Sequence, residues 1–168
     1  KPKAQGIEET AVLDLVSPPI GAPLYSALGD IGGFRHDDLT KVPAYNFTTP
    51  SLTSTTSIDY AELAPATMVR VGNTGSTGGV GISTTAGNTW WQGQVPAGVT
   101  SGGNVALSAD GGAIVWSPGG IAVQVSTTFG SNWAAATGLP VGAVVESDRV
   151  NPSKFYALAN GIFYVSTN

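Results

Sequence analysis

The sequence predicts an all-β fold that is rich in turns, and three observations support this prediction. Gly (23 residues) and Pro (11 residues) are abundant while charged residues make up only 11%, so few long helices can form. Apolar residues make up 42% of the chain, and they occur in short runs bounded by Gly, Pro, Asn or Asp. Disorder is not expected, because the net charge is only −4 and large apolar residues recur regularly.

The composition also excludes several kinds of partner and site. The seven Lys and Arg residues form no basic stripe, so nucleic acid is not an expected partner. The chain has no Cys and a single His, His36, so we expect no disulfide framework, no metal site and no cofactor. No apolar run approaches the ~18 residues that cross a membrane, so we expect no membrane partner.

A turn motif recurs along the chain and indicates a structural repeat. Ser83-Thr-Thr-Ala-Gly87-Asn-Thr-Trp90 and Ser126-Thr-Thr-Phe-Gly130-Ser-Asn-Trp133 both read S-x-x-x-G-x-x-W, and a third copy begins at Ser166. The first two serines are 43 residues apart and the next two are 40 apart. A period of roughly 40 to 50 residues with several short strands is typical of the four-stranded blade of a β-propeller.

The apolar runs place most of the strands of these blades. We expect blade-like repeats near residues 24–66, 67–110 and 111–150, with 151–168 starting the next. The hairpin over 24–36 aligns with the one over 155–166, and Asp110-Gly111 is a typical hairpin turn. The strands are expected at 11–16, 24–28, 67–71, 80–83, 105–107, 113–116, 121–126, 141–145, 155–158 and 162–166. Three to four blades cannot close a ring, so we expect an incomplete propeller that depends on the rest of a larger protein.

The repeated motif resembles the Asp-box, S-x-D-x-G-x-T-W, a hairpin turn found in sialidases, sorting receptors and several glycosidases. Thr85 and Thr128 stand where the Asp-box has Asp, so both copies are degenerate. The box stabilises a turn and carries no chemistry. We therefore expect Trp90 and Trp133 to pack between blade sheets.

Three longer segments resemble glycoside hydrolase family 74: Leu13-Asp-Leu-Val-Ser-Pro-Pro19, residues 24–39 and residues 144–156. The resemblance covers nearly the whole chain. It implies a secreted enzyme in which two seven-bladed propellers clasp a cleft and two Asp residues hydrolyse xyloglucan with inversion. It also implies that residues 1–168 are the N-terminal part of the second propeller, with xyloglucan or a related β-glucan and the first propeller as partners.

The segment Gly29-Asp30-Ile-Gly32-Gly33-Phe matches the family motif whose Asp is the general acid, which implies that role for Asp30. Small neighbours such as Gly32 and Gly33 would let a sugar approach the backbone closely. The alternative is that Asp30 caps a turn by bonding to the backbone two residues on. Asp37 and Asp38 are adjacent, so they are expected to be solvated turn residues and not an acid and base pair.

Several side chains are candidates for binding the substrate. Trp91 and Trp116 could stack on sugar faces, with core packing as the alternative for each. Tyr25 and Tyr45 could donate hydrogen bonds, and Arg35 and His36 could orient Asp30 or the substrate. The same residues would also suit half-buried or ordinary surface positions. Asn46-Phe47-Thr48 matches the N-glycosylation acceptor pattern.

Two further functions compete with an endo-acting or reducing-end-specific xyloglucanase. A non-catalytic Asp-box propeller could bind glycans or proteins as sorting receptors do, but those receptors carry disulfide-rich modules and this chain has no Cys. A sialidase would need an arginine cluster for the substrate carboxylate, and only Arg35, Arg70 and Arg149 are available.

Overall fold

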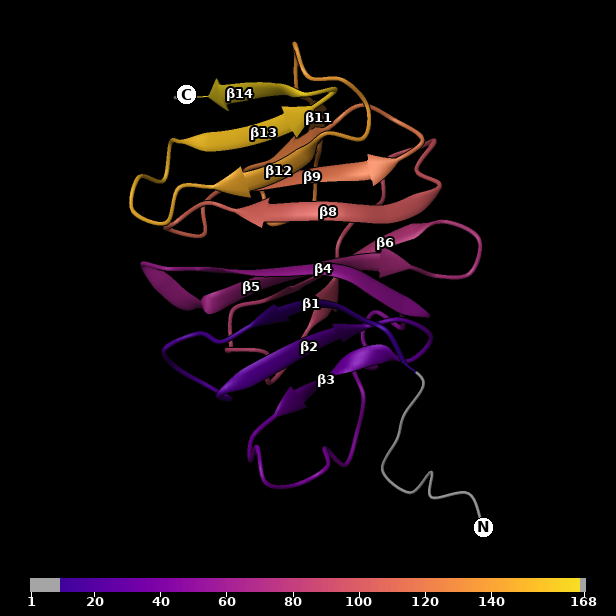
Figure 1. Cartoon of the computed structure of the whole chain (residues 1–168), viewed down its shortest axis with the longest axis vertical. Coiled ribbons are helices and arrows are strands. Elements are labelled where there is room, and N and C mark those ends of the chain that lie inside the picture. Colours follow the sequence, from indigo (N-terminus) through magenta and orange to yellow (C-terminus); the bar gives the residue numbers. More distant parts are fainter. Residues whose placement is uncertain (1–9, 167–168) are drawn as a thin grey trace.

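The computed structural model describes residues 10–166, which form fourteen strands and no helix. The strands make four antiparallel sheets that are stacked face to face in chain order (Figure 1). Within each sheet every strand pairs with its neighbours in sequence. These residues accordingly contain no helix that is long and apolar enough to cross a membrane.

The first and fourth sheets have three strands each and the two sheets between them have four. The first sheet contains β1 (Val12–Val16), β2 (Leu24–Leu28) and β3 (Gly32–His36). The second contains β4 (Ser54–Ala61), β5 (Ala64–Asn73), β6 (Gly78–Ser83) and β7 (Trp91–Gln92). The third contains β8 (Ser101–Leu107), β9 (Ile114–Gly119), β10 (Gln124–Ser126) and β11 (Ala134–Ala135). The fourth contains β12 (Val144–Ser147), β13 (Phe155–Ala159) and β14 (Ile162–Ser166).

This architecture confirms the expected all-β fold of an incomplete propeller, because four sheets follow one another without closing into a ring. The sheet boundaries differ from the repeat ranges expected from the sequence. The expected division between residues 66 and 67 falls inside β5, within one continuous sheet. Each sheet instead begins earlier in the repeat, at a strand that contacts the first strand of the next sheet.

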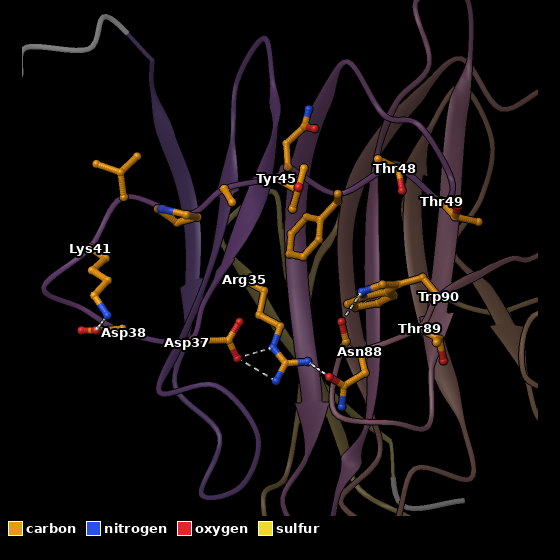
Figure 2. A pocket seen from close by; sticks show the side chains of 16 residues that line it. Arg35, Asp37, Asp38, Lys41, Tyr45, Thr48, Thr49, Asn88, Thr89 and Trp90 are labelled. Carbon is orange, nitrogen blue, oxygen red and sulfur yellow. Dashed lines mark hydrogen bonds and ion pairs between the residues drawn. The ribbon is translucent and has the colours of Figure 1, made fainter.

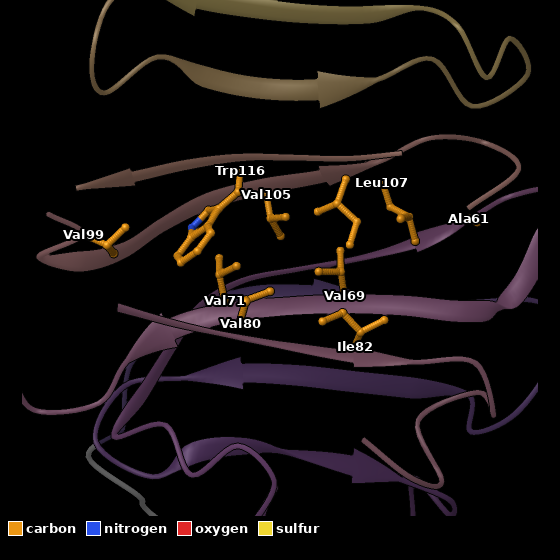
Figure 3. Packing of buried hydrophobic residues seen from close by; sticks show 10 residues of the cluster. Ala61, Val69, Val71, Val80, Ile82, Val99, Val105, Leu107 and Trp116 are labelled. Carbon is orange, nitrogen blue, oxygen red and sulfur yellow. The ribbon is translucent and has the colours of Figure 1, made fainter. Parts of the chain in front are cut away.

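The core consists of apolar layers between successive sheets. Between the second and third sheets, Val69 and Ile82 from one side meet Leu107 and Trp116 from the other (Figure 3). A second layer between the third and fourth sheets includes Val145, and a third between the first and second includes Tyr25. The central sheets are therefore buried on both faces, which explains the nearly continuous burial along β6 and β9.

Polar side chains on the first strand of each sheet bond to the first strand of the next. Asp14 Oδ2 accepts the Ile58 N–H at 2.9 Å, and Asp59 Oδ2 accepts the Leu107 N–H at 2.7 Å. Asn104 Oδ1 accepts the Val145 N–H at 2.6 Å. Because buried polar groups need partners, these bonds fix each sheet relative to its neighbour.

The two complete Asp-box-like turns share one hydrogen-bond pattern. Ser83 Oγ accepts the N–H groups of Thr85 (3.2 Å) and Gly87 (3.0 Å), and Thr85 Oγ1 accepts the Thr89 N–H at 2.9 Å. Ser126 and Thr128 repeat these bonds in the second turn. A threonine hydroxyl therefore fills the acceptor role that the motif gives to Asp, and the turn keeps its shape.

Trp90 and Trp133 lie between sheets, as expected. Trp90 packs against the apolar layer of the first and second sheets, with its ring 5.7 Å from that of Phe47. Trp133 contacts Trp116 at 5.4 Å between ring centres, and its Nε1–H donates to Gln94 O at 2.8 Å. Both residues therefore have structural roles.

Candidate active site

Asp30 lies in the turn between β2 and β3, where the backbone is unusually tight. The Ile31 N–H donates to Gly29 O at 2.8 Å, and the Gly33 N–H donates to Ile31 O at 2.9 Å. The two central residues have positive φ angles, +68° at Asp30 and +76° at Gly32. Two successive three-residue turns of this kind are rare and strained, and such strain collects at functional sites.

The equivalent hairpin of the fourth sheet shows what is special about this turn. There Ala159 pairs with Ile162, so Asn160 and Gly161 form a two-residue turn. In the first sheet Leu28 pairs with Gly32, which leaves three residues between the strands. Asp30 is the middle one of these three and therefore lies at the tip.

The Asp30 side chain is exposed, and within residues 10–166 no group donates a hydrogen bond or forms an ion pair with its carboxylate. Three other turn carboxylates, those of Asp38, Asp110 and Asp148, each accept backbone N–H groups. The turn-capping alternative for Asp30 is therefore wrong. Its carboxylate is available to a molecule outside this part of the chain.

Two side chains from other segments hold the peptide groups around Asp30. Ser54 Oγ, at the start of β4, accepts the Asp30 N–H at 3.1 Å. Asn46 Nδ2 donates to Ile31 O at 3.1 Å. The sequence did not single out Ser54, and it singled out Asn46 only as a glycosylation candidate, because a polar residue in a turn-rich segment has no pattern that identifies its partner.

Gly32 and Gly33 are required by the protein's own backbone. A Cβ on Gly32 would lie 2.7 Å from Leu52 O, and one on Gly33 would lie 2.0 Å from Ser26 O. Both glycines are buried, so the expected close approach of a sugar at these positions is wrong. They permit the turn that presents Asp30.

The expectation that Trp116 stacks on a sugar is also wrong. Its side chain is fully buried and its Nε1–H donates to Gly102 O, so neither face of the ring is open. Trp91 is 38% exposed on the edge strand β7, in agreement with the expectation that it faces outward. Trp91 pairs with Ile82 of β6, whereas the Ser54 end of the same sheet is marked by Gly78, four residues earlier in β6. Trp91 is therefore displaced along the strands by about 13 Å from the end of the sheet that holds Ser54.

Tyr25, Arg35 and His36 do not contact Asp30. Tyr25 is fully buried, and its hydroxyl donates to Ala86 O at 2.7 Å and accepts the Ala22 N–H. It is therefore a core residue, and the expectation that it binds the substrate is wrong. His36 Nε2 bonds to Ser26 Oγ at 2.9 Å, and burial lowers its pKa. Arg35 pairs with Asp37 at 2.8 Å. The three residues lie at the end of the β2–β3 hairpin opposite the Asp30 turn.

A groove of about 640 Å³ with polar and apolar lining residues lies beside this end of the hairpin, and Asp30 is not among them (Figure 2). Ion pairs join Arg35 to Asp37 and Lys41 to Asp38 along its wall. Asp37 is largely exposed, and Asp38 bonds to Thr40 and Lys41, as expected of turn residues. Tyr45 is 85% exposed, and Asn46 of the glycosylation pattern is also exposed.

The three arginines do not form a cluster that could bind a substrate carboxylate, because each has partners of its own within the described residues. The Arg70 guanidinium is buried, donates to Thr49 O and Pro50 O, and lies over the rings of Phe47 and Trp90. Burial lowers its pKa to about 9, so it stays charged at neutral pH. Since Arg35 and Arg149 pair with Asp37 and Asp59, the sialidase alternative has no support. No group of three His, Asp or Glu residues between 10 and 166 could hold a metal ion.

A series of antiparallel sheets, two of which carry an Asp-box-like turn between their third and fourth strands, defines this chain as part of a β-propeller, and Asp30 is its candidate reactive group. The comparisons with known proteins give the family. A xyloglucanase from a Paenibacillus species is 52% identical over 98% of the chain and 17% of its own length. The solved structure of a family 74 xyloglucanase from Xanthomonas campestris is 39% identical with a TM-score of 0.87, over 97% of this chain and 24% of that one.

The chain belongs to glycoside hydrolase family 74. An oligoxyloglucan-reducing end-specific xyloglucanase from Emericella nidulans is also similar, at 34% identity over 98% of the chain and 24% of its own length. The chain thus spans about a fifth of the length of these relatives. No protein-family model matches the sequence.

Proposed function

We propose that this segment belongs to a secreted, endo-acting enzyme that hydrolyses the β-1,4-glucan backbone of xyloglucan with inversion. In this proposal Asp30 is the general acid, and the segment is the N-terminal part of the second of two propellers. The first propeller supplies the general base. This division of roles follows the family resemblance and requires both parts of the enzyme.

The proposed chemistry needs two carboxyl groups on opposite faces of one sugar ring. The protonated Asp30 carboxyl gives its proton to the glycosidic oxygen as the bond from that oxygen to the anomeric carbon breaks. The second carboxylate removes a proton from water, and the resulting hydroxyl bonds to the anomeric carbon from the other face. Inverting enzymes separate the two carboxyl groups by roughly 6.5–9.5 Å to admit this water.

One observation carries the proposal: the exposed carboxylate of Asp30 has no partner within residues 10–166, and it sits on a strained, positive-φ turn. A carboxylate that only stabilised the turn would accept nearby N–H groups, as Asp110 and Asp148 do. A strained backbone persists only where its surroundings fix it, and here Ser54 and Asn46 do so. The relatives named xyloglucanases supply the substrate class.

The test measures release of reducing ends from xyloglucan by the protein that contains this segment. We expect Asp30→Asn to lower turnover by about 10²- to 10⁴-fold, the usual contribution of a general acid. The control Asp37→Asn removes an exposed carboxylate of the same chain and should keep turnover near wild type. Proton NMR of the first product should show the α-anomer.

Two outcomes would count against the proposal. Retained turnover by Asp30→Asn would remove Asp30 from the mechanism. Binding of xyloglucan by the wild-type protein without any turnover would favour the alternative of a non-catalytic propeller that binds glycans.

A further inference from the structure

We propose that Ser54 and Asn46 are positioning residues that hold the Asp30 carboxyl in its working direction. This inference rests on the proposed role of Asp30 as general acid. It adds two residues, from separate segments of the chain, whose contribution to turnover runs entirely through the backbone of the β2–β3 turn.

Ser54 acts on the peptide group that precedes the Asp30 side chain. Its Oγ accepts the Asp30 N–H at 3.1 Å, from the first residue of β4 in the second sheet. Asp30 has a φ of +68°, which a residue with a side chain adopts only at a cost in free energy. A bond to the neighbouring sheet offsets part of that cost and prevents the peptide from rotating.

Asn46 acts on the second peptide group after the Asp30 Cα, the one between Ile31 and Gly32. Its Nδ2 donates to Ile31 O at 3.1 Å, and this carbonyl also accepts the Gly33 N–H at 2.9 Å. Asn46 is itself well fixed, because it forms an isolated bridge with Phe34. The next residue, Phe47, is buried and its N–H donates to Gly33 O at 2.9 Å.

The two bonds hold the peptide group that precedes the Asp30 Cα and the one between Ile31 and Gly32, and the Ile31 N–H of the peptide group between these two donates to Gly29 O at 2.8 Å. The direction of the Asp30 Cβ is therefore set by contacts outside the hairpin, while the carboxylate itself stays free to meet the substrate. A misplacement of about 1 Å at a reacting group costs up to ~10²-fold in rate, so small rotations of this turn matter.

The experiment uses kcat and KM of the whole enzyme on xyloglucan. We expect Ser54→Ala and Asn46→Ala each to lower kcat roughly tenfold with little change in KM, because substrate contacts are kept and the proton donor is misdirected. Ser54→Thr keeps a hydroxyl and should restore kcat to within about twofold of wild type. A residue needed only for folding would lower the amount of active enzyme, and active-site titration would show that loss.

Two matched controls separate this role from other effects. Thr48→Ala destroys the same glycosylation pattern as Asn46→Ala but leaves the amide that donates to Ile31 O. Ser51→Ala removes an exposed hydroxyl three residues before Ser54 that forms no bond within residues 10–166. Both controls should keep wild-type kcat.

The outcomes distinguish this inference from the proposed function. If Asp30→Asn is inactive while Ser54→Ala and Asn46→Ala keep wild-type kcat, the positioning role is wrong and the general acid stands. An equal loss in Thr48→Ala would overturn the role of the Asn46 amide. Full turnover by Asp30→Asn would remove the proposed function and this inference together.

Discussion

Arg149 Nη1 lies 2.6 Å from Asp59 Oδ1, and this ion pair joins the fourth sheet to the second. The Asp59 side chain is only 4% exposed, whereas that of Arg149 is 42% exposed. Asp59 also accepts the Leu107 N–H of the third sheet, so one carboxylate connects three successive sheets. The pair thereby ties the loop after β12 to the first strand of the second sheet.

Removing Arg149 should destabilise this part of the protein. Burial raises the pKa of Asp59, and the nearby Arg149 guanidinium opposes that rise. We expect Arg149→Met to cost about 2 kcal/mol, less than the ~3–5 kcal/mol for a fully buried pair because Arg149 is partly exposed. Thermal unfolding of the protein that contains the segment measures this. An unchanged melting temperature would show that the pair contributes nothing net.

The two tryptophans Trp116 and Trp91 should respond in opposite ways to truncation. Trp116→Ala empties a fully buried site between the second and third sheets, and we expect a loss of about 3–5 kcal/mol. Trp91→Ala, on an exposed edge strand, should change stability by roughly 0.5 kcal/mol or less. Denaturant unfolding of both variants checks this. Similar losses in the two would contradict the assignment of Trp116 to the core.

The serine hydroxyls of the Asp-box-like turns should stabilise those turns locally. Ser83→Ala leaves the N–H groups of Thr85 and Gly87 without their acceptor, at a cost of about 1–3 kcal/mol. Thr84→Ala, at an exposed neighbour, is the matched control. Hydrogen exchange followed by mass spectrometry should show faster exchange around residues 83–90 only in the first variant. Equal exchange in both would mean that the turn does not depend on the serine.

Acid should weaken the turn that contains Asp110. Hydrogen bonds from the Ser108 hydroxyl and the Gly112 N–H lower the pKa of Asp110. Its folded pKa therefore lies below the unfolded value, so its contribution to stability is present above about pH 4 and is lost as the pH falls through the folded pKa. We expect Asp110→Asn to be less stable than wild type at pH 6 but equal to it near pH 2. A constant difference across this range would contradict the expectation.

Much of the fold could be predicted from the sequence, because the repeat and the short apolar runs reflect packing between sheets. The strand β4 was missed since Thr55, Ser57 and Asp59 are polar although all three are buried. Ser57 and Asp59 accept hydrogen bonds from backbone N–H groups of the next sheet. These positions of β4 are therefore polar, and the strand lacks the run of apolar residues that would predict it from the sequence. The two-residue strands β7 and β11 are too short to show any period.

The candidate site was predictable only in part. The family motif pointed to Asp30, but it could not show that Ser54 and Asn46 hold its turn, because those contacts join segments far apart in the chain. Trp116 was misjudged because β9 is buried on both faces, and such a strand lacks the alternation that distinguishes core from surface. Gly32 and Gly33 were assigned to the substrate because the sequence does not show which backbone atoms lie closest to them. Those atoms are Leu52 O, from a loop, and Ser26 O, from strand β2.

The most direct test of Asp30 as proton donor compares two substrates that differ only in the leaving group. Xyloglucan oligosaccharides need protonation of a poor leaving oxygen, whereas their dinitrophenyl glycosides depart with little help from an acid. We expect Asp30→Asn to lower kcat/KM by about 10²-fold or more on the natural linkage and by far less on the dinitrophenyl glycoside. An equal loss on both substrates, or no loss on the natural one, would contradict the account.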